Sequence, residues 1–441
     1  MKLHKRPIVA ATVALMTIAG LAGCGTDSTS GSASSSGSSS ATIIWAVQSG
    51  QSDSYQAGVD RWNAAHPDQP IQLQLMPDAD YKTKIRVALG ANQGPDLIFS
   101  WGGGSLKDFI DAGYIDPLDS YVSQYPDLLS KFLPAVMTPV QFNNQTYGVP
   151  IANMQPVVVF YNKQVFSDAS IQPADTWDNL MNSVIPTLNA QGVAPFTVAG
   201  QSQWPDLPFL EYLVDRVGGP QVFDNIANNV PNSWSDPSMI QALTMIQDMV
   251  KAKGVTSNFS SLAYETGAAD ALLYTNKAGM ELMLASAYAN MNKSAPDFVS
   301  SGNLAYTTFP AVTGGKGDTS NIVGNPSNYW SLNAKSTAAH KATAVQFLAE
   351  QVENTQWASE ILGRNGLPPI AAAESMMTGD NMAFAKYCFD LVQQAGNFQM
   401  SWDQALSADQ GSALLTQLDQ LFLLQTTPQD FADAMNKTIT S

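Results

Sequence analysis

Short apolar segments alternate with amphipathic segments along most of the chain, and this alternation restricts the fold more than any other feature. β-Branched and aromatic residues fill several short runs, which predict strands at residues 41–50, 71–77, 95–101 and 156–163. Apolar residues at helical spacing predict helices at residues 81–93, 105–113, 176–192, 238–254, 336–354 and 426–439. Strands that alternate with helices favour an α/β fold with mostly parallel sheets.

Capping residues support the ends of these helices. Ser105 is expected to be the N-cap of one helix, and Gly113 to stop it. Thr176 is the expected N-cap of another helix. Thr427 precedes Pro428, which suits the first helical position because proline lacks the N–H that would be unpaired there.

The first residues predict a targeting segment rather than part of the fold. A basic start, MKLHKRP, precedes an apolar stretch that is too short for a membrane-spanning helix and suits a signal peptide. The letters LAGC, which end at Cys24, resemble the lipobox of bacterial lipoproteins. Residues 1–23 are therefore expected to be a lipoprotein signal peptide and Cys24 a lipidated N-terminus. An ordinary signal peptide with a chance cysteine is the alternative.

Residues 24–41 are expected to join the lipidated cysteine to the folded part. The stretch GTDSTSGSASSSGSSSA is rich in serine and glycine and has no core-forming residues. A flexible coil of this length spans about 22 Å on average, so it would hold a domain close to a membrane.

The charge of the chain excludes some classes of partner. The formal net charge is −16 and no basic run is present, which disfavours nucleic acid and anionic lipid head groups. Neutral or cationic small molecules remain open. With Cys24 lipidated, Cys388 has no cysteine partner, and its apolar neighbours predict a buried structural thiol.

Motifs for catalysis, metal binding and cofactor binding are missing. The three histidines, His4, His66 and His340, and Cys388 show no zinc-ligand spacing, so no metal or other cofactor is expected. No G-x-S-x-G elbow and no S-x-x-K motif occur. The stretch GGKGDTS is not a P-loop because glycine follows its lysine.

The carboxylates and tryptophans of the chain are compatible with two functions that involve sugars, namely hydrolysis and binding. A surface glycoside hydrolase needs only two carboxylates, and Glu265, Glu281 and Asp403 are the candidate cleft acids, although nothing in the sequence pairs them. Several tryptophans fall near expected strand ends, where α/β folds bind ligands. Aromatic faces suit the C–H faces of sugars, and polar side chains suit their hydroxyls. The dispersed tryptophans are Trp45, Trp101, Trp204, Trp234, Trp330 and Trp402.

Several blocks of the sequence, in the order in which they occur, resemble those of the family 1 extracellular solute-binding proteins. These are the sugar-capturing lipoproteins of bacterial ABC importers. The resemblance spans residues 42–441. The blocks that carry it are ATIIWAVQSG, GPDLIFSWGGGSLKDFIDAGYIDPLD, YGVPIANMQPVVVFYNKQVF, PADTWDNL, NKAGMELMLASAY, GNPSNYWSLNAKS, NGLPPI and the C-terminal stretch from SWDQ onward.

The resemblance implies a type II periplasmic-binding-protein-like α/β fold with two discontinuous lobes, a hinge and a ligand cleft between them. Lobe I is expected at residues 42–162 plus 303–332, and lobe II at residues 163–302 plus 333–441. In the family, a Gly-x-Trp motif supplies a tryptophan that stacks on the ligand. The matching residues here begin Ala285-Ser286, so this tryptophan is missing. Whether Tyr288 replaces it is left open by the sequence. The implied ligand-binding residues are Gln48, Ser49, Asp53, Trp101, Asn153, Trp204, Glu265, Ser286, Asn325, Arg364, Trp402 and Asp403.

The implied function is capture of an extracellular oligosaccharide by hinge closure and its delivery to an ABC transporter permease with its ATPase. The protein is expected to be a monomer without enzymatic activity, held by its lipid on the extracellular face of the cell membrane. The WGGG and GNPSN blocks resemble those of members that take up plant-derived sugars such as xylo-oligosaccharides. An enzyme acting on the same sugars and a binding protein for iron or another ion are the alternatives.

Overall fold

The computed structural model describes residues 40–49, 51–352 and 354–439. The predicted signal peptide, Cys24 and nearly all of the predicted tether lie outside these residues. Within them, no helix combines the length and the apolar character needed to cross a membrane.

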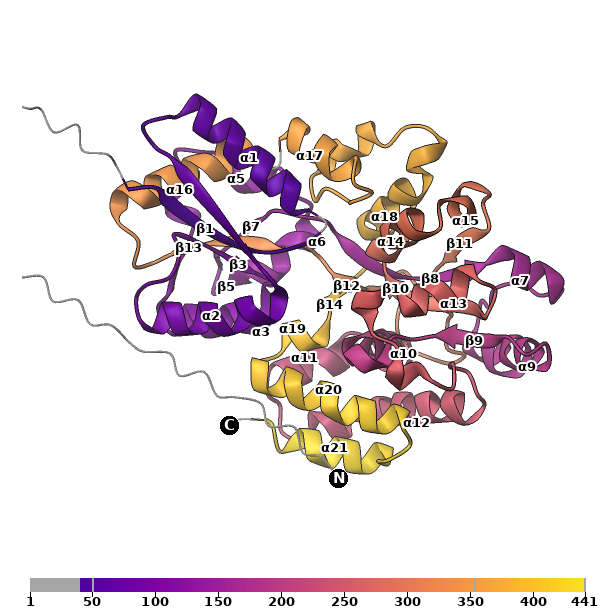
Figure 1. The fold of residues 1–441 in the computed structure, drawn as a ribbon. Helices are drawn as coiled ribbons and strands as arrows, with labels where there is room; N and C mark the ends of the chain where they lie inside the picture. The colour runs from indigo at the N-terminus through magenta and orange to yellow at the C-terminus, as the bar shows by residue number, and fades with distance from the viewer. Residues whose placement is uncertain (1–39, 50, 353, 440–441) are drawn as a thin grey trace, which may run out of the picture. The chain divides into compact units, whose positions relative to one another are not determined.

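The first of two six-stranded sheets has the order β2-β1-β3-β13-β4, with β7 paired to β13 (Figure 1). β1 runs parallel to β2 and β3, whereas β13 runs antiparallel to β3, β4 and β7. Its strands are β1 (Thr42–Val47), β2 (Ile71–Met76), β3 (Leu97–Ser100), β4 (Ile115–Asp116), β7 (Val149–Pro150) and β13 (Tyr329–Asn333).

The second sheet has the order β14-β12-β8-β10-β9, with β11 paired to β8. The long strand β8 is antiparallel to β10, β11 and β12. The strands are β8 (Gln155–Asn162), β9 (Ala194–Thr197), β10 (Ala278–Leu284), β11 (Leu304–Thr307), β12 (Ile322–Asn325) and β14 (Phe398–Met400). A separate hairpin joins β5 (Gln141–Phe142) to β6 (Gln145–Thr146).

Lobe I is the first sheet with the helices that pack on it. α16 contacts β1 and β13, and α17 contacts α1, so both helices belong to this lobe despite their late position in the chain. Its helices are α1 (Ser52–Ala65), α2 (Asp78–Gly90), α3 (Gly103–Asp111), α4 (Asp119–Val122), α5 (Asp127–Ser130), α6 (Pro134–Met137), α16 (Ala338–Gln351) and α17 (Thr355–Leu362).

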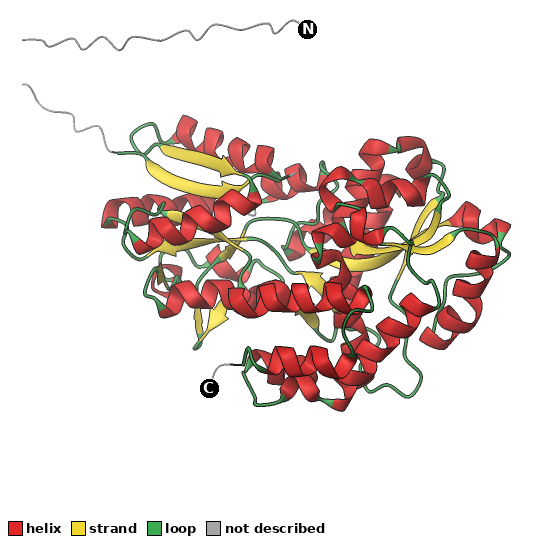
Figure 2. Ribbon diagram, turned by 60° about the horizontal axis from the view of Figure 1, so that its bottom comes forward, coloured by secondary structure: helices red, strands yellow, loops and turns green. Residues whose placement is uncertain are grey.

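Lobe II is the second sheet with its own helices, and Figure 2 shows that helices lie outside the strands in both lobes. α10 is buried along nearly its whole length and contacts α12, α11 and β12. The helices are α7 (Lys163–Asp168), α8 (Trp177–Asn179), α9 (Ile185–Ala190), α10 (Leu207–Gly218), α11 (Gln221–Ala227), α12 (Pro237–Lys251), α13 (Ala268–Tyr274), α14 (Ser286–Ser294), α15 (Pro296–Ser300), α18 (Ala383–Gln394), α19 (Trp402–Ala405), α20 (Ala408–Phe422) and α21 (Pro428–Asn436).

Most of the predicted helix ends are confirmed. Thr176 Oγ1 accepts a hydrogen bond from Asn179 N at 3.2 Å, and Thr427 Oγ1 accepts one from Asp430 N at 3.1 Å. The predicted N-cap Ser105 is wrong, because α3 begins two residues earlier, at Gly103. Ser105 instead lies in the first turn, where its hydroxyl donates to the Gly102 carbonyl.

The sheets and the lobe boundaries also differ from the prediction. Both sheets are mixed rather than mostly parallel, because β13 and β8 each run against their neighbours. β8, β11 and β12 were expected in lobe I but pair in the second sheet. α16 and α17, whose residues were expected in lobe II, pack on lobe I. The two-lobed α/β architecture itself is confirmed.

Candidate functional site

Trp101 and Asp403, which are about 300 residues apart in the sequence, line the same pocket of about 660 Å³. We call it the interlobe pocket because α2, β3 and α3 of lobe I form one side, and α19 and α20 of lobe II form the other. Its volume lies in the range of small-molecule sites. The lining residues include Tyr81, Lys82, Arg86, Phe99, Ser100, Trp101, Ser105, Phe109, Asp403, Gln404, Asp409 and Ser412.

The glycines after Trp101 let the two lobes approach each other at the edge of this pocket. A Cβ on Gly103 would lie 2.6 Å from the Gln404 carbonyl oxygen, and one on Gly104 would lie 2.8 Å from the Ala405 carbonyl oxygen. Gly103 also has a φ of +60°, which side chains with a Cβ rarely adopt. The first turn of α3 therefore rests directly on the backbone of α19.

Trp101 lies among other aromatic side chains and remains partly exposed. Its ring centroid lies 5.1 Å from that of Phe99 and 6.2 Å from that of Tyr81, both in edge-to-face geometry. The Tyr81 hydroxyl donates to the Phe99 carbonyl at 2.6 Å, and burial raises the pKa of Tyr81 well above its usual value. These contacts fix the strand end that presents Trp101 to the pocket.

Trp402 does not line the pocket, and the expectation that it stacks on a ligand is corrected here. Its side chain is only 1% exposed and stacks on Phe223, with 4.5 Å between ring centroids. Trp234 packs edge-on against it. Trp402 therefore anchors the adjacent Asp403 to the core of lobe II.

Three of the other predicted residues meet on lobe II. Trp204 packs edge-on against Tyr264, with ring centroids 4.7 Å apart, and Tyr264 Oη lies 3.4 Å from Ser286 Oγ. Glu265 is exposed and accepts a hydrogen bond from Ser202 Oγ at 3.0 Å. We call Trp204, Tyr264, Ser286 and Glu265 the lobe II cluster.

Tyr264 was not predicted. Burial raises its pKa, so its hydroxyl stays neutral and can both donate and accept. Its position directly before the predicted Glu265 was the one signal in the sequence.

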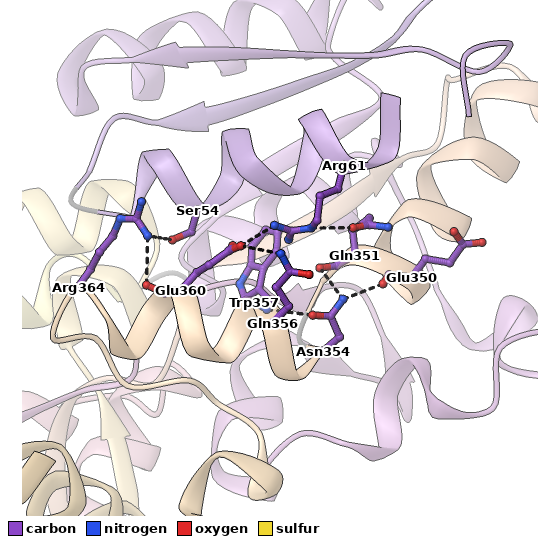
Figure 3. Close-up of polar contacts among 9 residues, drawn as sticks. All are labelled: Ser54, Arg61, Glu350, Gln351, Asn354, Gln356, Trp357, Glu360 and Arg364. Carbon is purple, nitrogen blue, oxygen red and sulfur yellow. Dashed lines mark hydrogen bonds and ion pairs between the residues drawn. The ribbon is translucent and has the colours of Figure 1, made fainter. Parts of the chain in front are cut away.

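Four predicted residues lie near the start of α1 in lobe I. Arg364 follows α17, and its guanidinium reaches Ser54 Oγ at 3.3 Å and Asp53 Oδ2 at 3.7 Å. Figure 3 shows Arg364 at one end of a row of polar contacts between α1 and α17. Gln48 and Ser49, at the end of β1, are exposed.

Asn153 lies between β7 of the first sheet and β8 of the second, and Asn325 lies where the chain leaves β12 for β13. Both residues are buried. Asn153 Oδ1 accepts a hydrogen bond from Leu367 N at 2.5 Å. Asn325 ends β12, opposite Gln155 of β8, and its Oδ1 has no hydrogen-bond partner among the described residues.

The candidate acids of a hydrolase do not form a cleft pair. Glu281 is fully buried in β10, and burial together with the Asp270 carboxyl raises its pKa well above the usual value. Glu265 lies on the surface of lobe II and Asp403 in the interlobe pocket. Tyr288 stacks on Phe384, with 4.2 Å between centroids, so one of its faces is covered. No group of three metal-ligating side chains occurs in the part of the chain that the structure describes.

Two α/β lobes built from discontinuous segments, with a pocket between them, form the type II periplasmic-binding-protein fold. The profile of the bacterial extracellular solute-binding proteins matches residues 48–356. The chain belongs to that family.

Two known proteins with similar sequences each match about half of this chain. An uncharacterized ABC transporter extracellular-binding protein of Pyrococcus horikoshii is 26% identical over 246 residues, 54% of this chain and 54% of that protein. The xylose/arabinose-binding protein of Haloferax volcanii is 22% identical over 227 residues, 50% of this chain and 48% of that protein. The chain therefore spans about half the length of these relatives in each match.

Solved structures match nearly the whole chain. A structure described with xylan utilization by the thermophilic bacterium Caldanaerobius polysaccharolyticus is 26% identical, with a TM-score of 0.78, and covers 91% of this chain and 100% of that one. A chitin oligosaccharide binding protein is 21% identical, with a TM-score of 0.80, and covers 91% of this chain and 98% of that one. The second likeness shows the shared fold.

Proposed function

We propose that the chain captures an extracellular oligosaccharide between its lobes and delivers it to an ABC transporter permease. The observation that carries this proposal is that Trp101 of lobe I and Asp403 of lobe II line one pocket. A ligand in contact with both side chains favours the arrangement in which the lobes are together, which is the basis of capture by hinge closure.

The chemistry of the pocket suits a sugar. An indole face packs against the C–H face of a sugar ring, and a carboxylate accepts two hydrogen bonds from neighbouring hydroxyls. Trp204, Tyr264 and Ser286 provide a second aromatic and hydroxyl surface on lobe II. A xylo-oligosaccharide is our first choice of ligand, because the WGGG and GNPSN blocks and the xylan-related structure at 26% identity support it.

Isothermal titration with xylo-, chito- and malto-oligosaccharides tests this proposal. We expect saturable binding of at least one sugar with a stoichiometry of one per chain. Tight binding of peptides or polyamines with none of any sugar would contradict it. Overnight incubation with the same sugars and analysis of the products addresses the hydrolase alternative, since release of shorter sugars would favour an enzyme.

We also propose that Cys24 carries a lipid that holds the protein on the extracellular face of the membrane, with the serine-rich stretch as a tether. The LAGC letters at the end of the apolar segment support this. A binding protein confined to the membrane surface meets its permease more often than one free in solution, because tethering raises the effective concentration. We expect it to act as a monomer.

A further inference from the structure

The short helix α19 places Asp403 in the interlobe pocket. The helix has few internal interactions that would fix Asp403 in this position. It has four residues, and its N-cap residue Ser401 makes no side-chain capping bond. The first N–H groups of any helix lack acceptors within the helix, so an end like this one needs an acceptor from elsewhere.

Glu211, in the middle of α10, supplies that acceptor. Its Oε1 accepts one hydrogen bond from the backbone N–H of Trp402 at 2.8 Å and another from the Ser401 hydroxyl at 3.0 Å. Glu211 is 1% exposed and lies in the core of lobe II. A buried side chain of one helix thus caps the helix that bears the pocket residue.

The second carboxyl oxygen of Glu211, Oε2, has no hydrogen-bond partner among the described residues. The pKa of Glu211 is raised to about 8, chiefly by burial and to a smaller extent by the nearby Asp403 carboxylate, although the hydrogen bonds from Trp402 and Ser401 lower it. Tyr212, the next residue of α10, is a titratable group that also interacts with it. At neutral pH the side chain is therefore an uncharged acceptor.

We propose that Glu211 is a positioning residue for ligand binding, which fixes Asp403 in the interlobe pocket by capping α19 without touching the ligand. This rests on the proposed function of the same pocket. Glu211→Leu keeps the size of the side chain but removes the acceptor, whereas Glu211→Gln keeps an uncharged acceptor oxygen. Ser401→Ala is a milder variant, because it removes one of the two donors and leaves the core intact.

A mutant cycle with Asp403→Ala tests whether Glu211 acts through Asp403. With the sugar of the panel that wild type binds most tightly, we expect Glu211→Leu to weaken binding roughly tenfold, Ser401→Ala less, and Glu211→Gln by less than twofold. In the Asp403→Ala background, Glu211→Leu should have no further effect. An equal tenfold loss in that background would overturn the proposal.

The pH dependence of binding separates positioning from a general loss of packing. Above about pH 8 wild-type Glu211 ionises. Its capping bonds persist, but its charge repels the nearby Asp403 carboxylate, so we expect affinity to fall in the wild type and to stay level in Glu211→Gln. Identical pH profiles of the two proteins would count against the proposal.

Amide hydrogen exchange tests whether Glu211 caps α19 even if no sugar binds. We expect the Trp402 amide to exchange at least tenfold faster in Glu211→Leu than in wild type or Glu211→Gln, with the buried Leu421 of α20 unchanged. Unchanged exchange at Trp402 would refute the proposal, whereas absence of sugar binding alone would refute only the proposed function.

Discussion

The ammonium group of Lys82 lies 4.8 Å from the centroid of the Trp101 ring, over its face. Cation–π contacts of this kind at partly exposed sites are worth about 0.5–1 kcal/mol. A sugar that stacks on the same face must displace Lys82, whose side chain is exposed. The ammonium group of an exposed lysine thus covers one face of the Trp101 ring in the pocket.

Trp101→Ala should fold normally and lose most of its sugar affinity. The lost stacking surface is worth about 2 kcal/mol, or roughly thirtyfold in the dissociation constant. Trp101→Phe, which keeps an aromatic face, should lose much less. Titration calorimetry measures both, and Tyr125→Ala is the control because Tyr125 is a partly buried aromatic of lobe I outside the interlobe pocket. Normal sugar binding by Trp101→Ala would show that Trp101 has a structural role and does not contact the ligand.

Gly104→Ala should weaken ligand binding without unfolding lobe I. Alanine is favoured over glycine within a helix by about 1 kcal/mol, so α3 itself gains stability. The new methyl group, however, meets the backbone of Ala405 and Leu406, which forces the lobes apart at the edge of the pocket. We expect affinity to fall about tenfold, because a smaller fraction of molecules has the lobes together.

Gly90→Ala is the matched control for this substitution. Gly90 is the last residue of α2, and the nearest atom to an added Cβ is Tyr114 Oη at 4.0 Å. If both variants bind alike, the α3–α19 contact does not govern ligand binding.

Glu211→Gln should make the stability of the protein less dependent on pH. The unfolded state releases the Glu211 proton near pH 4.5 and the folded state near pH 8, so ionisation favours the unfolded state between these values. The wild type therefore loses stability relative to Glu211→Gln as the pH rises from about 4.5 to 8, by at most about 4–5 kcal/mol. Urea unfolding at pH 5, 6.5 and 8 measures this difference, and parallel curves would contradict it.

Trp402→Ala should destabilise lobe II by about 3–5 kcal/mol, because it leaves a cavity between Phe223 and Trp234. Urea denaturation checks this. A variant that keeps its stability but loses sugar affinity would instead support a ligand-stacking role for Trp402.

Cys24→Ser should move the protein from the membrane to the soluble fraction of cells that process lipoproteins. Detergent phase partition and the intact mass of the mature protein measure the change. Recovery of an unlipidated wild-type protein whose N-terminus is not Cys24 would favour an ordinary signal peptide.

Local features of the fold were predictable from the sequence because they depend on neighbouring residues. The caps at Thr176 and Thr427 are examples. The pairing of strands was not predictable, because periodicity shows that β8 is a buried strand but not which sheet it joins. α16 shows the same limit, since an amphipathic helix does not reveal which lobe its apolar face covers.

The candidate site was predictable in part for a similar reason. Tryptophans near strand ends include both pocket residues and core residues, and the sequence does not separate them. Trp101 follows β3 and reaches the interlobe pocket, whereas Trp402 begins α19 and turns into the core. Asp403, beside Trp402, still reaches the pocket because successive helical positions point about 100° apart.

The place of β13 in the first sheet affects how the protein is made. This strand lies between β3 and β4, but its residues, Tyr329–Asn333, come after most of lobe II in the chain. The sheet of lobe I therefore stays incomplete until three quarters of the polypeptide has been synthesised. A chain that ends before Tyr329 lacks the strand between β3 and β4, so the fold of lobe I cannot be completed before most of lobe II has been made.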